Sequence, residues 1–306
     1  MKRLITILFW GVTTMYASAT LTTLSETTPD TQGVPSNHEL EGMTLIWQDE
    51  FNGTGAPNPA MWRFETGFVR NEEDQWYQAE NALMSNGALV ITAKRERKAN
   101  PNYQSGSSDW KRNREYAQYT SSCMVATNSY VFKYGTVIVR AKIPTTQGAW
   151  PAIWSVGNWW EWPLNGEIDI MEFYKGKIHA NVCWGGDSRW NGTWDSANKE
   201  LSYFTKKDQY WREKYHEWRM DWTPEFIRLY LDGELLNETD LKFTFNKSDH
   251  GAGQGAYQNP YSNDHAGFGQ LIMLNLAIGG INGRPIDDLA FPMKYEIDYI
   301  RVYQNK

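Results

Sequence analysis

Three absences limit what this chain of 306 residues can be. No apolar run reaches the roughly 18 residues that a membrane-spanning helix needs, so the body of the protein does not lie in a bilayer. Basic residues are not in excess, because 30 Lys and Arg stand against 36 Asp and Glu, and the net charge of −6 argues against a nucleic-acid partner. Cysteine is scarce as well. Cys123 and Cys183 can form a disulfide in an oxidising compartment or lie buried as small apolar residues, and both alternatives stay open.

What the chain has in excess is tryptophan. It contains 16 Trp, 17 Tyr and 12 Phe, while 41% of its residues are apolar and 22% are charged, which is typical of a folded soluble protein. Such an excess indicates either a very aromatic core or a groove in which flat rings stack against ligands such as sugars.

The N-terminal residues predict a leader and a tether. Two basic residues precede an apolar stretch over residues 4–12, and a small-residue cleavage site ends at Ala19. This arrangement predicts a signal peptide over residues 1–19 and a secreted or periplasmic protein, and its removal changes the net charge from −6 to −8. Residues 20–42, rich in Thr, Ser and Pro, predict a flexible segment. One domain of catalytic size remains, over residues 43–306.

Apolar residues in this domain mostly alternate with polar ones. Strand-like runs bounded by Gly, Asn, Asp or Pro cover residues 88–94, 134–143, 226–231 and 295–303. Asp232-Gly233 predicts a hairpin turn after one of these runs. Helical patterns are rare, and the best candidate is 206–217, for which a loop is the alternative. The sequence therefore predicts an all-β fold in which two antiparallel sheets form a sandwich.

One short stretch, residues 166–172, carries the chemistry. Strand alternation puts Glu167 and Asp169 on one face and the two isoleucines between them on the other. In a regular strand Glu172 would point into the core, where an unpaired carboxylate costs on the order of 3 kcal/mol or more. A β-bulge at Ile170-Met171 would absorb one residue and return Glu172 to the face of the other two carboxylates.

The spacing of these carboxylates fits general acid and nucleophile chemistry. At about 3.3 Å per residue the Cα atoms of Glu167 and Glu172 lie about 13 Å apart, and side chains that lean together bring the carboxyl groups to about 5–6 Å. Retaining glycosidases have about 5–5.5 Å and inverting ones more, and the arithmetic leaves both open. Because three neighbouring carboxylates share protons, one glutamate is expected to be ionised and the other protonated. The alternatives are a calcium site or an ordinary acidic strand.

The tryptophans on either side of the acidic strand are candidates for sugar binding. Trp150 and Trp154 share one face if their segment is a strand, while Trp159-Trp160 looks more like part of a loop. Trp184 follows the acidic strand. Part of this set is expected to lie in the core instead.

Trp150-Pro151-Ala152-Ile153-Trp154 followed by the acidic strand resembles glycoside hydrolase family 16, in the laminarinase-like branch with a bulged Glu-x-Asp-x-x-Glu strand. Flanking segments also resemble that family: residues 47–51, Asn71 with 75–77, 275–280 and 295–303. The resemblance implies a β-jelly-roll with an open substrate cleft and endo-cleavage of a β-linked polysaccharide with retention of configuration.

The resemblance also implies roles for individual residues. Glu167 would be the nucleophile, Glu172 the general acid/base and Asp169 the carboxylate that tunes the nucleophile. The substrate-binding candidates are Trp150, Trp154, Trp159, Trp160, Asn71 and Trp184. No cofactor is required for the chemistry. A structural calcium ion is implied on the convex side, near Asp298 and the backbone of Glu50, although an ordinary strand-end carboxylate is an equal alternative for Asp298.

One departure from the family pattern concerns the substrate. Many laminarinase-like members have a His directly before a Trp, where this chain has Cys183. A thiol cannot donate and accept hydrogen bonds as an imidazole does, so a bond to the sugar is missing or replaced. His179 is offset by four positions and is expected to be a structural histidine.

The resulting hypothesis is a secreted, monomeric, retaining endo-β-glycanase that acts on β-1,3- or mixed-linkage β-glucan. One alternative is an endo-β-galactosidase that acts on galactans or mucin-type chains. Another is a non-catalytic jelly roll that only binds glycans.

Overall fold

The computed structural model describes residues 40–127, 130–248, 251 and 253–306, which all belong to one compact unit, Asn37–Lys306. The expected signal peptide, and the expected flexible segment as far as residue 39, lie outside the described residues. No helix in the described ranges is long and apolar enough to cross a membrane.

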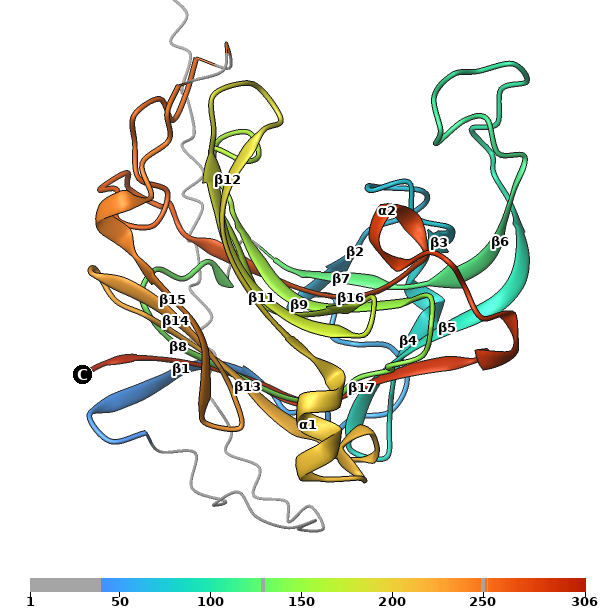
Figure 1. The fold of residues 1–306 in the computed structure, drawn as a ribbon, viewed down its shortest axis with the longest axis horizontal. Helices are drawn as coiled ribbons and strands as arrows, with labels where there is room; N and C mark the ends of the chain where they lie inside the picture. The colour runs from blue at the N-terminus through green and yellow to red at the C-terminus, as the bar shows by residue number, and fades with distance from the viewer. Residues whose placement is uncertain (1–39, 128–129, 249–250, 252) are drawn as a thin grey trace, which may run out of the picture. The chain divides into compact units, whose positions relative to one another are not determined.

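Two sheets account for the strands of the described residues (Figure 1). The larger sheet has ten strands, eight of them in the order β15 (Glu234–Asp240), β14 (Phe226–Leu231), β13 (His216–Trp222), β8 (Gly135–Lys142), β17 (Met293–Asn305), β5 (Ala88–Ala99), β6 (Tyr116–Ser121) and β3 (Gln75–Tyr77). In addition, β1 (Met43–Asp49) pairs with β17, and β4 (Ala82–Ser85) pairs with β5.

The smaller sheet has seven strands and carries the acidic stretch. Their order is β12 (Gly192–Glu200), β11 (Lys177–Gly185), β10 (Glu167–Tyr174), β9 (Ala149–Gly157), β16 (Gln270–Ile278), β7 (Cys123–Ala126) and β2 (Trp62–Phe64). Apart from the parallel pair of β3 and β6, the paired strands are antiparallel. The predicted two-sheet antiparallel sandwich, a jelly roll, is confirmed.

Helices are short in the described part of the chain. They are α1 (Leu201–Lys207), α2 (Gly280–Gly283) and the 3-10 turns η1 (Ala79–Asn81), η3 (Trp211–Glu213), η4 (Leu241–Phe243) and η5 (Asp288–Ala290). The helix expected over 206–217 is wrong in its position: α1 ends at Lys207, a 3-10 turn follows, and β13 begins at His216.

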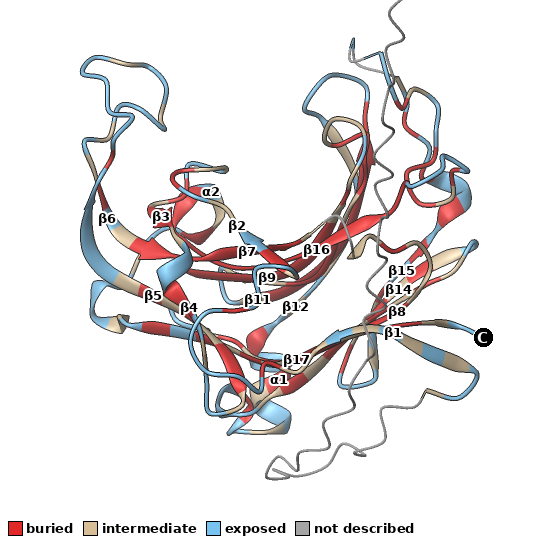
Figure 2. Ribbon diagram, turned by 180° about the vertical axis from the view of Figure 1, so that it is seen from behind, coloured by how far each residue is buried: buried red, intermediate tan, exposed pale blue. Residues whose placement is uncertain are grey.

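Alternation explains how the sheets pack. Along β13 every second residue is buried, so Trp218 and Trp222 lie fully inside while their neighbours are partly exposed. The hairpin from β14 to β15 turns at Asp232 and Gly233, which have φ of 48° and 79°, as this type of tight turn requires. Buried residues dominate the central strands of both sheets, while the ends of the hairpins are exposed (Figure 2).

The smaller sheet is curved, and its concave face positions the site. All nine residues of β16 are buried, because one face of that strand meets the core and the other lies at the floor of a cleft. The β11–β12 hairpin and the β5–β6 hairpin rise on opposite sides of this concave face (Figure 1).

Candidate active site

The bulge expected in the acidic strand is present in β10. Asp169 pairs with Asn181 and Glu172 pairs with His179, so Ile170 and Met171 together face a single residue of β11. Both bulged side chains lie in the hydrophobic core with no exposed surface. The extra residue therefore returns Glu172 to the concave face, as the cost of burying its carboxylate among isoleucines predicts.

Strand pairing gives each carboxylate a row of neighbours, meaning the residues that lie directly opposite one another on successive strands of the sheet. The row of Glu167 holds Val156, Cys183 and Trp194. The row of Asp169 holds Met273, Trp154, Asn181 and Ser196, and the row of Glu172 holds Asn275, Ala152, His179 and Asn198. Residues directly opposite on antiparallel strands share a face, so these rows form the cleft surface around the three carboxylates.

Three donors hold the carboxylates. Trp150 Nε1 donates to Glu172 Oε1 at 2.7 Å, and the Trp162 indole N–H donates to Glu167. Asn181 Nδ2 lies 3.2 Å from Asp169 Oδ2 and 3.4 Å from Glu172 Oε2. Asp169 is also within hydrogen-bonding reach of both glutamates, so one carboxyl group links the other two.

Tyr261 anchors the start of β10. The Glu167 backbone N–H donates to the Tyr261 hydroxyl at 3.0 Å. Gly166, with φ of 76°, packs so close to this ring that a Cβ would come within 2.8 Å of it. Only glycine allows this approach without strain, so the start of β10 is fixed by a contact with a segment about 95 residues away in the sequence.

Burial raises the pKa of each carboxyl group, and repulsion from neighbouring carboxylates adds to the rise for Asp169 and Glu172. Burial raises the pKa of Asp169 well above its usual range, and the charges of Glu172 and Glu167 add to this. Burial raises the pKa of Glu172 to about 7, with repulsion from Glu167 adding and the Trp150 hydrogen bond opposing. Burial also raises the pKa of Glu167, but bonds from Trp162 and Asp169 and the charge of Arg70 oppose the rise. Glu167 thus has the environment that best supports a charged carboxylate.

Glu167 and Glu172 line a cleft of about 940 Å³, while Asp169 is buried between them. Of the predicted sugar-binding residues, Trp150, Trp154 and Asn71 line this cleft. Trp154 donates through Nε1 to Asn275 at 2.7 Å, and the Arg70 guanidinium lies 5.1 Å from the centre of its ring. These contacts fix the indole plane within the wall of the cleft.

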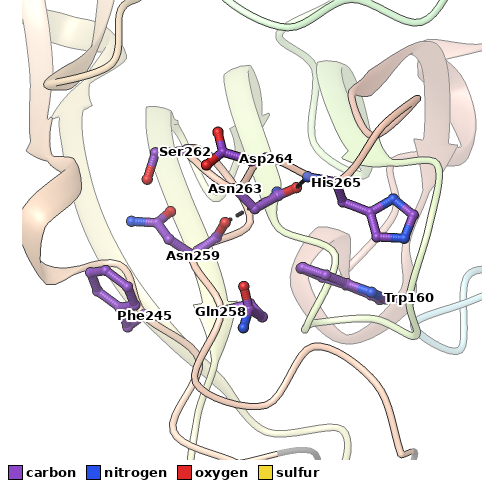
Figure 3. A pocket seen from close by; sticks show the side chains of 8 residues that line it. All are labelled: Trp160, Phe245, Gln258, Asn259, Ser262, Asn263, Asp264 and His265. Carbon is purple, nitrogen blue, oxygen red and sulfur yellow. Dashed lines mark hydrogen bonds between the residues drawn. The ribbon is translucent and has the colours of Figure 1, made fainter.

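The other three predicted tryptophans do not line the cleft. Trp184 is wrong as a sugar contact because its side chain faces the opposite side of β11 and lies in the core. Trp159 stands beside His265, with ring centres 4.3 Å apart. Trp160 packs on Phe268 at 4.7 Å and lines a separate hollow together with His265 (Figure 3).

Several cleft residues were not among the predicted substrate-binding residues. They are Arg70, Trp162, Tyr174, His179, Trp194 and Asn275. Asn181 also lines the cleft, and alternation from Cys183 could have placed it there, because the two residues are two positions apart on one strand.

The two cysteines are free and buried, so the disulfide alternative is not realised. Cys183 belongs to the row of Glu167, yet none of its surface is exposed. Gly192 and the Trp194 indole cover it: a Cβ on Gly192 would lie 2.4 Å from the Cys183 Sγ and 3.1 Å from the Trp194 Nε1. The departure from the family pattern therefore leaves Trp194, not a polar group, exposed at this position.

The residues proposed to hold calcium do not fit a carboxylate-based metal site. The Asp298 carboxylate forms an ion pair with Arg140. Both carboxylate oxygens of Glu50 accept hydrogen bonds from the Arg301 guanidinium, each at 2.7 Å. The described part of the chain contains no group of three or more His, Cys, Asp or Glu that could hold a metal ion. Arginine partners already neutralise these two carboxylates, so the implied calcium ion gains no support from them.

Comparison with known proteins gives a family and several relatives. The family model of glycosyl hydrolases family 16 matches residues 70–252. The glucan endo-1,3-beta-glucosidase A1 of Niallia circulans is 29% identical over 292 residues, which cover 90% of this chain and 40% of that protein. The chain thus spans less than half the length of this relative.

Two solved structures resemble the chain over most of its length. One comes from work on endo-acting O-glycanases with which members of the human gut microbiota initiate mucin breakdown. It is 30% identical, with a TM-score of 0.75, and covers 89% of this chain and 94% of its own. The laminarinase from Rhodothermus marinus is 28% identical, with a TM-score of 0.66, and covers 86% of this chain and 97% of its own.

Proposed function

Because the chain belongs to glycosyl hydrolase family 16, we propose that it is a retaining endo-β-glycanase whose nucleophile is Glu167 and whose general acid/base is Glu172. The observation that carries this proposal is the bulged strand β10, which presents both glutamates to one cleft and keeps Asp169 buried on the same face between them. One Asp169 carboxyl group reaches both glutamates, which supports the short separation expected of a retaining mechanism.

In the first step Glu167 attacks the anomeric carbon, and Glu172 gives its proton to the leaving oxygen. The raised pKa of Glu172, about 7, keeps that proton available at neutral pH. Asp169, protonated in its buried position, donates to Glu167 and so favours the charged nucleophile. In the second step Glu172 takes a proton from water, and the water breaks the glycosyl ester on Glu167.

The first substrate candidate is β-1,3- or mixed-linkage β-glucan. The similarity to a glucan endo-1,3-beta-glucosidase and to a laminarinase supports it. Trp150, Trp154 and Trp194 offer flat apolar surfaces to sugar rings along the cleft.

The second candidate is an endo-β-galactosidase that acts on galactan or mucin-type chains. Two observations favour it. The fully buried Cys183 offers the sugar no polar group, and the TM-score to the structure from the O-glycanase work, 0.75, exceeds the 0.66 of the laminarinase. Secretion as a monomer belongs to the proposal in either case and is supported by the leader-like residues 1–19.

A product assay tests the proposal. Laminarin, mixed-linkage glucan, agarose, keratan-type chains and mucin O-glycans are each incubated with the wild-type protein and with Glu167→Gln, Glu172→Gln and the exposed control Glu80→Gln. We expect short oligosaccharides from one class, released first as the β-anomer, and losses of at least about 10³-fold in the two cleft variants only. Binding without cleavage would favour the lectin alternative, and an α-anomeric first product would refute retention.

A further inference from the structure

A short loop, residues 70–74, connects the cleft to two arginines that lie outside it. Three of its residues line the cleft, namely Arg70, Asn71 and Glu73. Asn71 is also exposed, so a sugar in the cleft can reach this residue. The way in which this loop is held therefore affects how the cleft presents a sugar-binding group.

The backbone of the loop is strained at Glu72. Asn71 and Glu72 have φ of 56° and 50°, both in the left-handed region. Asparagine adopts this conformation readily, but in a glutamate the Cβ comes too close to the following carbonyl oxygen. A residue of this kind stays left-handed only where its surroundings hold it, and such residues cluster at functional sites.

Two arginines from remote segments hold this turn. Arg114, from the hairpin between β5 and β6, donates from Nη2 to the Glu72 carbonyl at 3.0 Å and from Nη1 to the Glu73 carbonyl at 2.8 Å. Arg284, which follows α2, donates from Nη2 to the same Glu72 carbonyl at 3.1 Å. Both guanidinium groups thus converge on the carbonyl oxygen of the strained residue.

The loop is also fastened to α2. The Ile281 N–H donates to the Asn71 carbonyl at 3.0 Å. The Asp74 carboxylate accepts two hydrogen bonds from Arg284, each at 2.8 Å. Gly280 allows this close approach, because a Cβ there would come within 2.7 Å of the Asn71 oxygen. Ile281 itself lines the cleft, so the loop and α2 form one continuous wall.

We propose that Arg114 and Arg284 are positioning residues, which hold Glu72 in its left-handed conformation and so keep Asn71 in place to bind a sugar in the cleft. This inference rests on the proposed glycanase function, because it gives Asn71 a sugar contact. The arginines touch no substrate and act through the Glu72 carbonyl. Arg114 thereby couples the β5–β6 hairpin, which rises on one side of the concave face (Figure 1), to sugar binding.

Stability alone is the competing explanation. The Arg114 guanidinium also lies over the Phe68 and Trp110 rings, 4.8 Å and 5.3 Å from their centres. An arginine that only stabilises the fold would lower Tm on removal without changing how the folded protein binds a sugar. Loss of a positioning residue instead raises KM in the folded protein, and it is repaired by a change that lets residue 72 adopt a left-handed backbone unaided.

Four variants separate these explanations. Arg114→Met removes the donors and keeps an apolar side chain. Adding Glu72→Gly lets residue 72 adopt a positive φ without strain, whereas adding Glu72→Ala removes the same carboxylate and leaves the strain. The matched control is Arg112→Met in the same hairpin, where the Arg112 side chain pairs with the exposed Asp109.

The probe is laminarin, or mucin O-glycan where the wild-type protein cleaves that instead. Well below Tm we expect Arg114→Met to raise KM about tenfold with little change in kcat, because only the held conformation of the loop binds and its population falls. Adding Glu72→Gly should regain most of the loss and adding Glu72→Ala none, while Arg112→Met keeps the wild-type KM.

A lower Tm with an unchanged KM would overturn the inference in favour of stability alone. Regain by both second changes, or by neither, would also overturn it, since the backbone of residue 72 would then not be where the arginines act. If Arg114→Met does not fold, Arg284→Met takes its place, because it removes the other donor to the Glu72 carbonyl.

Hydrogen exchange of the free full chain tests the positioning without a substrate. The Asp74 amide donates to the Ile278 carbonyl at 2.8 Å and the Ile281 amide to Asn71, so both amides report whether the loop stays in place. We expect both to exchange at least about tenfold faster in Arg114→Met, with the β10 amides unchanged. Unchanged exchange at both would refute the positioning. If the wild-type protein cleaves no glycan but exchange changes as expected, the proposed function fails and the positioning of the loop stands.

Discussion

Replacing Glu172 with Gln should change how the stability of the protein depends on pH. The carboxyl group is buried in the folded protein, and its pKa there is about 7, against an ordinary value of 4.5. The unfolded chain therefore releases this proton at a lower pH than the folded protein does. Glutamine has the same shape and can accept from Trp150, but it has no proton to lose.

The size of the effect follows from the two pKa values. Below about pH 4.5 the carboxyl group is protonated in both the folded and the unfolded protein, so it does not make the free energy of unfolding depend on pH. Between about pH 4.5 and 7 the unfolded state alone loses the proton, so wild-type stability falls relative to the variant by about 1.4 kcal/mol per pH unit. The total difference is about 3 kcal/mol, and it is complete above about pH 8.

Thermal unfolding of both proteins from pH 4 to 9 measures this difference. For a domain of this size 1 kcal/mol shifts Tm by about 2–4 °C, so the variant should gain roughly 6–12 °C over the wild type as pH rises. The exposed control Glu80→Gln should follow the wild type at every pH. A constant Tm difference between Glu172→Gln and the wild type would refute the assigned burial of this carboxyl group, independently of any substrate.

Three further changes have defined outcomes. Trp150→Phe removes a donor that favours the charged acid, so the alkaline limb of the kcat/KM profile, near pH 7 in the wild type, should move up by about one unit. Gly166→Ala should lower the free energy of unfolding by about 2–4 kcal/mol, because its Cβ would meet the Tyr261 ring. Gly233→Ala, at a similar φ but with nothing within 4 Å, should cost only about 1 kcal/mol in the same denaturant titration. Both cysteines should react with a thiol reagent after unfolding without reductant, and an unreactive pair would contradict the free thiols.

Local rules were enough to predict the centre of the site. The alternation of Glu167 and Asp169 and the cost of burying Glu172 required a bulge, and the structure has one at that position. Both arguments depend only on neighbours along one strand. For the same reason the alternating runs predicted β8 and β14 and the turn that ends the second of them.

The predictions of sugar-binding tryptophans were less successful, both in the loop after β9 and on strand β11. Trp159 and Trp160 were expected in the cleft, but their direction is set by His265 and Phe268, about 100 residues further along the chain. No local pattern contains such a contact. Trp184 failed for a different reason: the strand alternation that puts Asn181 and Cys183 on the cleft side of β11 turns Trp184 into the core, and it was not applied to this residue.

Cys183 shows why a missing polar residue does not simply leave a gap. Its thiol lies on the cleft side of β11, yet Gly192 and the Trp194 indole close over it. A side chain at position 192 would clash with this arrangement, because its Cβ would come 2.4 Å from the sulfur and 3.1 Å from the Trp194 Nε1. The small cysteine, the glycine and the exposed tryptophan therefore form one unit, which gives this wall an apolar surface beside Glu167. Polar recognition then falls to other positions of the same sheet, where the side chains of Asn181, Asn198 and Asn275 line the cleft.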